Sequence, residues 1–98
     1  MKVIILHGLF MNKVIMAPLA RRIEQLGHVV ENISYPSTRA DKHRLFKTID
    51  KAVGEGPAVM VGHSLGGLVI TEYLFTNQVS KAKVPLVITL GTPHQGAE

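Results

Sequence analysis

Residues 59–67, VMVGHSLGG, determine the fold expected for this chain. The aliphatic run at 58–61 predicts a buried strand, and residues 68–75 predict a helix, so the glycine-rich stretch 62–67 predicts a tight turn between them. This turn contains the pattern G-x-S-x-G, in which a serine on a sharp, strained turn projects its hydroxyl from the carboxyl edge of a sheet. A strand, a tight turn and a helix in this order predict an α/β fold with a parallel sheet.

Short apolar runs alternate with helical patterns along the rest of the chain, which is typical of parallel βαβ units. Pro18 sets the expected start of the first helix near Met16 or Ala17, because a proline belongs in the first helical turn. Gly27 is placed for a left-handed C-cap of that helix. The expected strands are residues 3–6, 29–35, 58–61 and 84–90. The first expected helix ends near Leu26, and the other two span residues 41–53 and 68–75. The sequence therefore predicts four parallel strands and three helices with right-handed crossovers.

Length and composition exclude several classes of protein. The 98 residues are enough for one small domain, and 46% hydrophobic against 18% charged residues argue against disorder. Eleven Lys and Arg against seven Asp and Glu give a net charge of +4. These cations are spread along the chain without a nucleic-acid recognition motif, so we expect no nucleic-acid partner. We expect a single domain over residues 1–98.

Cofactors and a membrane span are also not expected. The chain has no cysteine, and its five histidines show no metal-ligand spacing, so no metal site is predicted. No nucleotide-binding fingerprint is present. The first apolar run covers only residues 3–6, which is too short for a signal peptide or a spanning helix, so we expect a cytoplasmic protein with no membrane span.

Ser64, at the centre of the G-x-S-x-G pattern, is the candidate nucleophile. Gly62 and Gly66 stand on either side of it, where we expect a Cβ to collide with the turn. The helix that follows directs its N-terminal amides and positive dipole end at the place where an oxyanion would form. The amides of Leu65 and Leu9 are the candidate oxyanion donors, since a loop after a neighbouring strand supplies the second donor at such a turn.

Two histidines lie next to these groups. His7 and Gly8 end the first strand, and we expect the His7 side chain to bond backbone and order the turn. His63 precedes the nucleophile, and we expect its side chain to point away from Ser64 and form part of the pocket wall.

The sequence resembles the α/β-hydrolases, and most closely their small bacterial lipase and esterase members. The matching stretches are VIILHGLF (3–10), MAPLARRIEQLGH (16–28), SYPSTR (34–39), VGHSLGGLVI (61–70) and LGTPHQGA (90–97). The resemblance implies a three-layer, doubly wound sheet with strand order 2-1-3-4, a nucleophile at Ser64, and oxyanion amides at Leu9 and Leu65. It also places the oxyanion loop beside the serine turn at a topological switch point, where open sheets bind ligands.

The sequence departs from this family in its catalytic triad. The family order is serine, then acid, then histidine, yet the residues after Ser64 include only Glu72 and Glu98 as acids and His94 as histidine. We expect Glu72 to face solvent and His94 to belong to a structural loop that forms a pocket wall, which makes it a doubtful base. The chain thus looks like the N-terminal half of a hydrolase, an incomplete domain without the segments that supply the acid and the histidine.

Three functions follow from these observations. The first is a serine hydrolase that cleaves carboxylic esters, including lipid acyl esters, through an acyl-enzyme on Ser64. The second is a catalytically incomplete remnant that acts as a binding module. The third is an interaction protein whose fourth strand is an exposed sheet edge that pairs with another copy of the chain, so that a homo-oligomer is expected.

Overall fold

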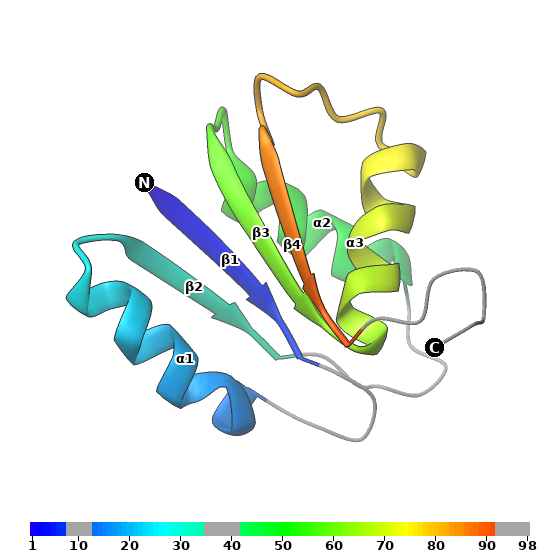
Figure 1. The fold of residues 1–98 in the computed structure, drawn as a ribbon. Helices are drawn as coiled ribbons and strands as arrows, with labels where there is room; N and C mark the ends of the chain where they lie inside the picture. Colours follow the sequence, from blue (N-terminus) through cyan, green and yellow to red (C-terminus); the bar gives the residue numbers. More distant parts are fainter. Residues whose placement is uncertain (8–12, 35–41, 92–98) are drawn as a thin grey trace.

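The computed structural model describes residues 1–7, 13–34 and 42–91 of the 98-residue chain, and its strands form one parallel sheet (Figure 1). The order of the strands across the sheet is β2-β1-β3-β4, and every neighbouring pair is parallel. The elements along the chain are β1 (Lys2–Leu6), α1 (Lys13–Gln25), β2 (Val29–Ile33), α2 (Lys42–Val53), β3 (Ala58–His63), α3 (Leu65–Thr76) and β4 (Leu86–Leu90). The predicted α/β class, element sequence and strand order are confirmed.

The sheet lies between α1 on one face and the pair α2 and α3 on the other (Figure 1). Successive side chains of a strand point to opposite faces, so β1 divides its aliphatic residues between two cores. Ile4 and Leu6 pack with residues of α2 and α3, whereas Val3 and Ile5 pack with α1. Both faces of β1 are therefore covered, which explains why its sequence is a continuous apolar run.

The register of the strands places the carboxyl-terminal ends of β1 and β3 side by side. Leu6 lies opposite Gly62 of β3 and opposite Ile33 of β2. On the other side of β3, His63 lies opposite Leu90, the last residue of β4. Because all four strands are parallel, the chain leaves each of them at one edge, and the serine turn lies at this carboxyl edge.

The first helix begins earlier than its proline predicts. α1 starts at Lys13, so Pro18 is the sixth residue of a 13-residue helix rather than part of its first turn. A proline at this position removes one N–H from the helical ladder. The apolar contacts of Met16 and Ala20 with β1 and β3 lie on both sides of Pro18 and offset this loss. The end of the helix agrees with expectation, since Gly27 has φ 97° and its N–H donates to the carbonyl of Glu24 at 3.0 Å.

The turn after β3 is shorter than predicted. β3 continues through Gly62 to His63, and α3 begins at Leu65, so Ser64 alone connects the strand to the helix. Gly62 therefore lies in β3, and Gly66 and Gly67 lie in α3, although their sequence predicts a loop. Close backbone packing at Gly62 and Gly66 leaves no room for a side chain. β4 is also shorter than expected because it begins at Leu86, after Pro85, which has no N–H for a strand ladder.

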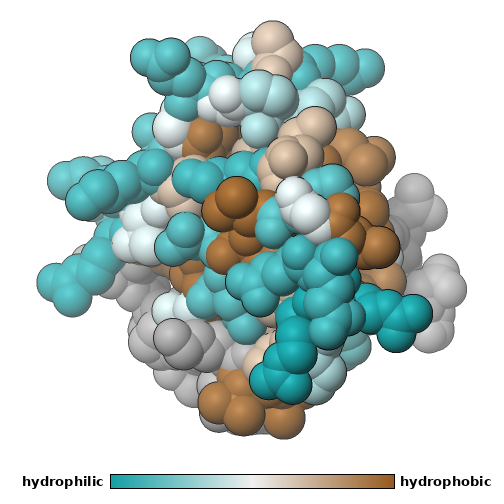
Figure 2. Space-filling model, turned by 90° about the vertical axis from the view of Figure 1, so that its left-hand side faces the viewer, coloured by the Kyte–Doolittle hydropathy of each residue, from teal (hydrophilic) through white to brown (hydrophobic). Residues whose placement is uncertain are grey.

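The two edge strands differ in character. β2, with the sequence VVENI, carries the charge of Glu31, and the side of the molecule near β2 and α1 shows hydrophilic side chains around separate hydrophobic patches (Figure 2). β4 has the uncharged sequence LVITL, and its Leu86, Ile88 and Leu90 are large exposed hydrophobic residues. Among the described residues no strand pairs with the outer edge of β4. Within the same residues, no helix is both long and apolar enough to cross a membrane.

Candidate active site

Ser64 occupies a strained backbone conformation between β3 and α3. Its φ of 55° and ψ of −119° lie in a region that L-residues rarely adopt. The positive φ agrees with the strain expected at this turn, although the ψ places the residue outside the left-handed helical region. The Ser64 hydroxyl makes no capping hydrogen bond to the backbone of α3. The turn therefore holds a serine at the carboxyl edge of the sheet without using its hydroxyl as a helix cap.

Two close backbone approaches explain the glycines around Ser64. A Cβ on Gly62 would lie 2.6 Å from the amide nitrogen of Gly67 and 2.7 Å from the carbonyl carbon of Gly66. A Cβ on Gly66 would collide with the carbonyl oxygen of Leu6 and lie 2.8 Å from that of His7. Gly66 thus allows α3 to approach the end of β1, whereas the expected collision was with the turn around Ser64 itself. The two glycines bring the start of the helix against two neighbouring strands.

Backbone hydrogen bonds fix the position of the turn. The N–H of Ser64 donates to the carbonyl of Leu90 at 2.8 Å, and the N–H of Gly67 donates to the carbonyl of Ser64 at 3.0 Å. Leu65 is the first residue of α3, so its N–H is one of the amides that the helix backbone itself leaves unbonded. The helix dipole adds partial positive charge at the same place. These groups provide the electrostatic environment that a developing oxyanion requires.

His7 and His63 follow neighbouring strands at this edge. His7 directly follows Leu6, the last residue of β1. Side chains alternate along β3, and Val61 packs with α1, so His63 lies on the α1 face of the sheet. His7 is fully buried, while His63 is half-buried with its Nδ1 atom buried and without a hydrogen-bond partner among the described residues. The expected roles of the two side chains, in the turn and in the pocket wall, stay predictions.

Three of the predicted site residues lie outside the described residues. Gly8 and Leu9 belong to the segment after β1, and His94 belongs to the segment after β4. The second oxyanion amide and the doubtful base therefore stay predictions. Within the described residues the structure brings together Ser64, the Leu65 amide, and the ends of β1 and β3.

A buried tyrosine supports the helix that follows Ser64, and the sequence analysis did not single it out. Tyr73 of α3 is fully buried, and its hydroxyl donates to Asp50 Oδ1 of α2 at 2.7 Å. Its ring meets that of Phe46 edge-on, with centroids 5.7 Å apart. Burial, and then the hydrogen bond to Asp50 and its negative charge, raise the pKa of Tyr73 well above its ordinary value. Phe46 and Asp50 are four residues apart, so the sequence indicates that they share one face of α2. This was the available signal that one residue of another element could contact both.

Glu72 faces away from the core and forms an ion pair. Its Oε2 atom lies 3.0 Å from Lys42 Nζ, and both side chains are largely exposed. This agrees with a solvent-facing position on α3. In residues 1–7, 13–34 and 42–91, no group of three or more histidine, cysteine or acidic side chains could hold a metal ion.

A parallel sheet with a strained serine between a central strand and its following helix defines an α/β-hydrolase-type domain. The family model described as PGAP1-like alpha/beta domain matches residues 50–98, which is half of the chain. The chain therefore belongs to the PGAP1-like alpha/beta domain family. This match begins on α2 and includes the serine turn.

Solved structures share this fold. The monoacylglycerol lipase of Paleococcus ferrophilus matches with a TM-score of 0.71 and 26% identity, over 90% of this chain and 37% of its own. An extracellular α/β-hydrolase from a Paenibacillus species matches with a TM-score of 0.70 and 21% identity, over 91% of this chain and 39% of its own. No curated protein matches the sequence. The chain thus spans about two fifths of the length of both hydrolases.

Proposed function

We propose that this chain is a serine hydrolase of the esterase or lipase type, with Ser64 as its nucleophile. The observation that carries the proposal is the backbone of Ser64, with φ 55° and ψ −119°, at the point where β3 meets α3. A strained conformation of this kind persists only where the surrounding structure imposes it, and such residues cluster at active sites. The close approach of Gly62 and Gly66 to neighbouring backbone supplies that constraint.

The proposed reaction proceeds through an acyl-enzyme. Ser64 Oγ attacks the ester carbonyl carbon while a base takes the hydroxyl proton, and the carbonyl oxygen becomes an oxyanion held by the amides of Leu65 and Leu9. The C–O bond to the alcohol then breaks, and the alcohol leaves with the proton from the base. Water hydrolyses the resulting acyl-serine by the same route, which releases the carboxylic acid and restores Ser64.

The proposed substrates are carboxylic esters, including lipid acyl esters. The similarity to the Paleococcus ferrophilus monoacylglycerol lipase supports an ester with a lipid acyl group. The aliphatic residues near the carboxyl edge, such as Leu90, suit an apolar acyl chain better than a charged one. The alternative is a binding or oligomerising module, which the exposed and uncharged strand β4 favours.

The test is hydrolysis of p-nitrophenyl acetate by the wild-type chain and by Ser64→Ala, His94→Ala and His43→Ala. His43 is an exposed residue of α2 and serves as the matched control. We expect slow turnover that Ser64→Ala abolishes and that the two histidine variants leave unchanged, because the only acids after Ser64 are Glu72, paired with Lys42, and Glu98. Turnover that survives Ser64→Ala contradicts the proposal. Robust turnover that both Ser64→Ala and His94→Ala abolish would identify His94 as the base.

A further inference from the structure

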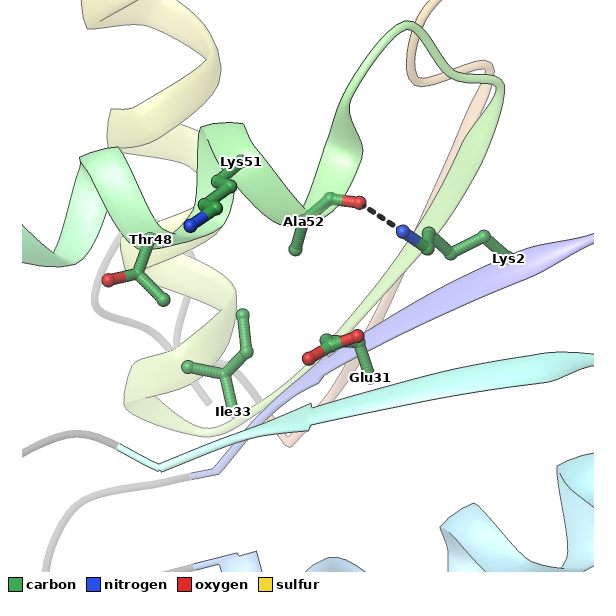
Figure 3. A pocket seen from close by; sticks show the side chains of 6 residues that line it. All are labelled: Lys2, Glu31, Ile33, Thr48, Lys51 and Ala52. Carbon is green, nitrogen blue, oxygen red and sulfur yellow. Dashed lines mark hydrogen bonds between the residues drawn. The ribbon is translucent and has the colours of Figure 1, made fainter.

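A cavity of about 390 Å³ opens between α2 and the strands β1 and β2. Its lining residues are Lys2, Glu31, Ile33, Thr48, Lys51 and Ala52 (Figure 3). None of them belongs to β3 or α3, the elements that hold Ser64. The volume lies in the range of small-molecule sites in proteins, and the proposed ester hydrolysis does not use this cavity.

Two opposite charges line the cavity from opposite walls. Lys51 extends from α2 and Glu31 from β2, with the space between them (Figure 3). Among the described residues, Lys42 and Glu72 form an ion pair at 3.0 Å, and neither of them lines this cavity. Lys51 and Glu31 are not paired with each other within 4.0 Å. A ligand between the two walls could contact both charges.

The walls of the cavity are held in place by internal hydrogen bonds. Lys2 Nζ donates to the carbonyl of Ala52 at 2.7 Å and so ties the last turn of α2 to β1 (Figure 3). A cation at the carboxyl end of a helix is also favoured by the helix dipole. Thr48 Oγ1 donates to the carbonyl of Arg44 at 3.1 Å, which leaves its oxygen available as an acceptor. Ile33 is buried and adds an apolar wall.

We propose that this cavity binds a small zwitterion whose amine and anionic group are joined by a short aliphatic chain. The ammonium group contacts the Glu31 carboxylate, the anionic group contacts Lys51, and the aliphatic chain lies against Ile33 and Ala52. A ligand with negative charge alone meets repulsion from Glu31, and one with positive charge alone meets repulsion from Lys51 and Lys2. A molecule with both charges can place each of them next to an opposite charge, the ammonium at Glu31 and the anionic group at Lys51.

The first experiment compares three probes of similar size: 4-aminobutyrate, butyrate and butylamine. Each is titrated into ¹⁵N-labelled full chain while amide chemical shifts are recorded. We expect 4-aminobutyrate to shift the amides of residues 31–33 and 48–52 saturably, with a dissociation constant about fivefold lower than those of the other two probes, since each of them lacks one exposed charged contact worth up to about fivefold. Equal binding of the three probes would overturn the proposal.

The second experiment tests the two charges by substitution. Glu31→Gln and Lys51→Gln should each weaken 4-aminobutyrate binding by about fivefold. Glu24→Gln and Lys47→Gln, which remove exposed charges outside the cavity, should leave it unchanged. The double variant Glu31→Lys with Lys51→Glu should restore binding, because the two charges exchange walls.

Failure of the double variant to bind, with an unchanged thermal melting temperature, would contradict the proposed role of the charges. Wild-type affinity in both single variants would contradict it as well. Ser64→Ala should bind 4-aminobutyrate as the wild type does. The zwitterion site and the hydrolase proposal are therefore tested separately.

Discussion

Tyr73 links the stability of the fold to alkaline pH. In the unfolded chain the tyrosine loses its proton near pH 10.0, whereas burial and the contact with Asp50 keep the pKa of the folded side chain above that value. The unfolded state then binds fewer protons than the folded state as pH rises above about 10, so stability is complete below this pH and falls above it. The buried hydroxyl is thus a stabilising group only while it stays protonated.

We expect Tyr73→Phe to cost about 1.5 kcal/mol at pH 7, because it removes a hydrogen bond to a charged acceptor. The same variant should lose less stability than the wild type between pH 9 and 11. Urea unfolding across this range measures both effects, with Tyr35→Phe, the other tyrosine, as the control. An equally steep decline in Tyr73→Phe would show that another group is responsible.

Gly66 is a second residue with a consequence that can be measured. The atoms that a Cβ would meet belong to the backbone of Leu6 and His7, which cannot rotate away as a flexible side chain can. We expect Gly66→Ala to destabilise the fold by about 3 kcal/mol. Gly27→Ala is the comparison, because its φ is +97° but nothing lies within 4 Å, so only backbone strain of about 1 kcal/mol applies. Equal costs in chemical denaturation would contradict the close approach at Gly66.

The motif was enough to predict Ser64 as the candidate site residue. It did not predict which backbone atoms the neighbouring glycines approach. The pattern G-x-S-x-G is local, so a single sequence indicates the strained serine and the helix start beside it. The approach of Gly66 to the end of β1 joins residues nearly sixty positions apart, and no local pattern reports it. The Tyr73–Asp50 hydrogen bond is likewise a contact between two helices that the sequence analysis considered separately.

Pro18 lies within α1 and makes this helix less stable than an alanine at the same position would. The residue is exposed, so its ring contributes little to packing. We expect Pro18→Ala to raise the free energy of unfolding by about 1–3 kcal/mol, because alanine restores a helical N–H and has a higher helix propensity. Thermal unfolding followed by circular dichroism measures the change. A lower melting temperature would show that the proline fixes a conformation the fold requires.

Whole elements were easier to predict than their ends. The continuous aliphatic run of β1 and the apolar stripe Leu45, Ile49 and Val53 of α2 are periodic signals, and both elements were predicted within one residue. The end of β3 and the start of α3 were not. Gly62, Gly66 and Gly67 have weak propensity for both strand and helix, so their sequence favours a loop, and only tertiary packing makes them regular.

At the scale of the whole molecule, the two edge strands of the sheet differ in charge, and no described strand pairs with the outer edge of either. Charged side chains such as Glu31 on an edge strand oppose pairing with another chain. β4 has no charge and no proline, and its alternate residues Leu86, Ile88 and Leu90 are 51%, 41% and 39% exposed. An uncharged edge with exposed leucines is a template for a further strand. We propose that two copies of the chain pair through β4.

We expect the wild-type chain to show a mass above 10.7 kDa that rises with concentration in light scattering. Ile88→Lys should shift it toward the monomer, because a lysine at the centre of the edge opposes pairing and faces its own copy across a two-fold axis. Val29→Lys, on the opposite edge strand, is the matched control and should associate as the wild type does. A wild-type chain that stays monomeric at all concentrations would refute the expected homo-oligomer.

The hydrogen bond from the Ser64 amide to the carbonyl of Leu90 connects β4 directly to the proposed nucleophile. The inner edge of this strand bonds to Ser64, while no strand among residues 1–7, 13–34 and 42–91 pairs with its outer edge. In the proposed pairing of two copies, the partner strand therefore lies next to the strand that is hydrogen-bonded to Ser64. We therefore expect a partner strand that straightens or twists β4 to change the strained backbone of Ser64, and with it any hydrolysis at this serine.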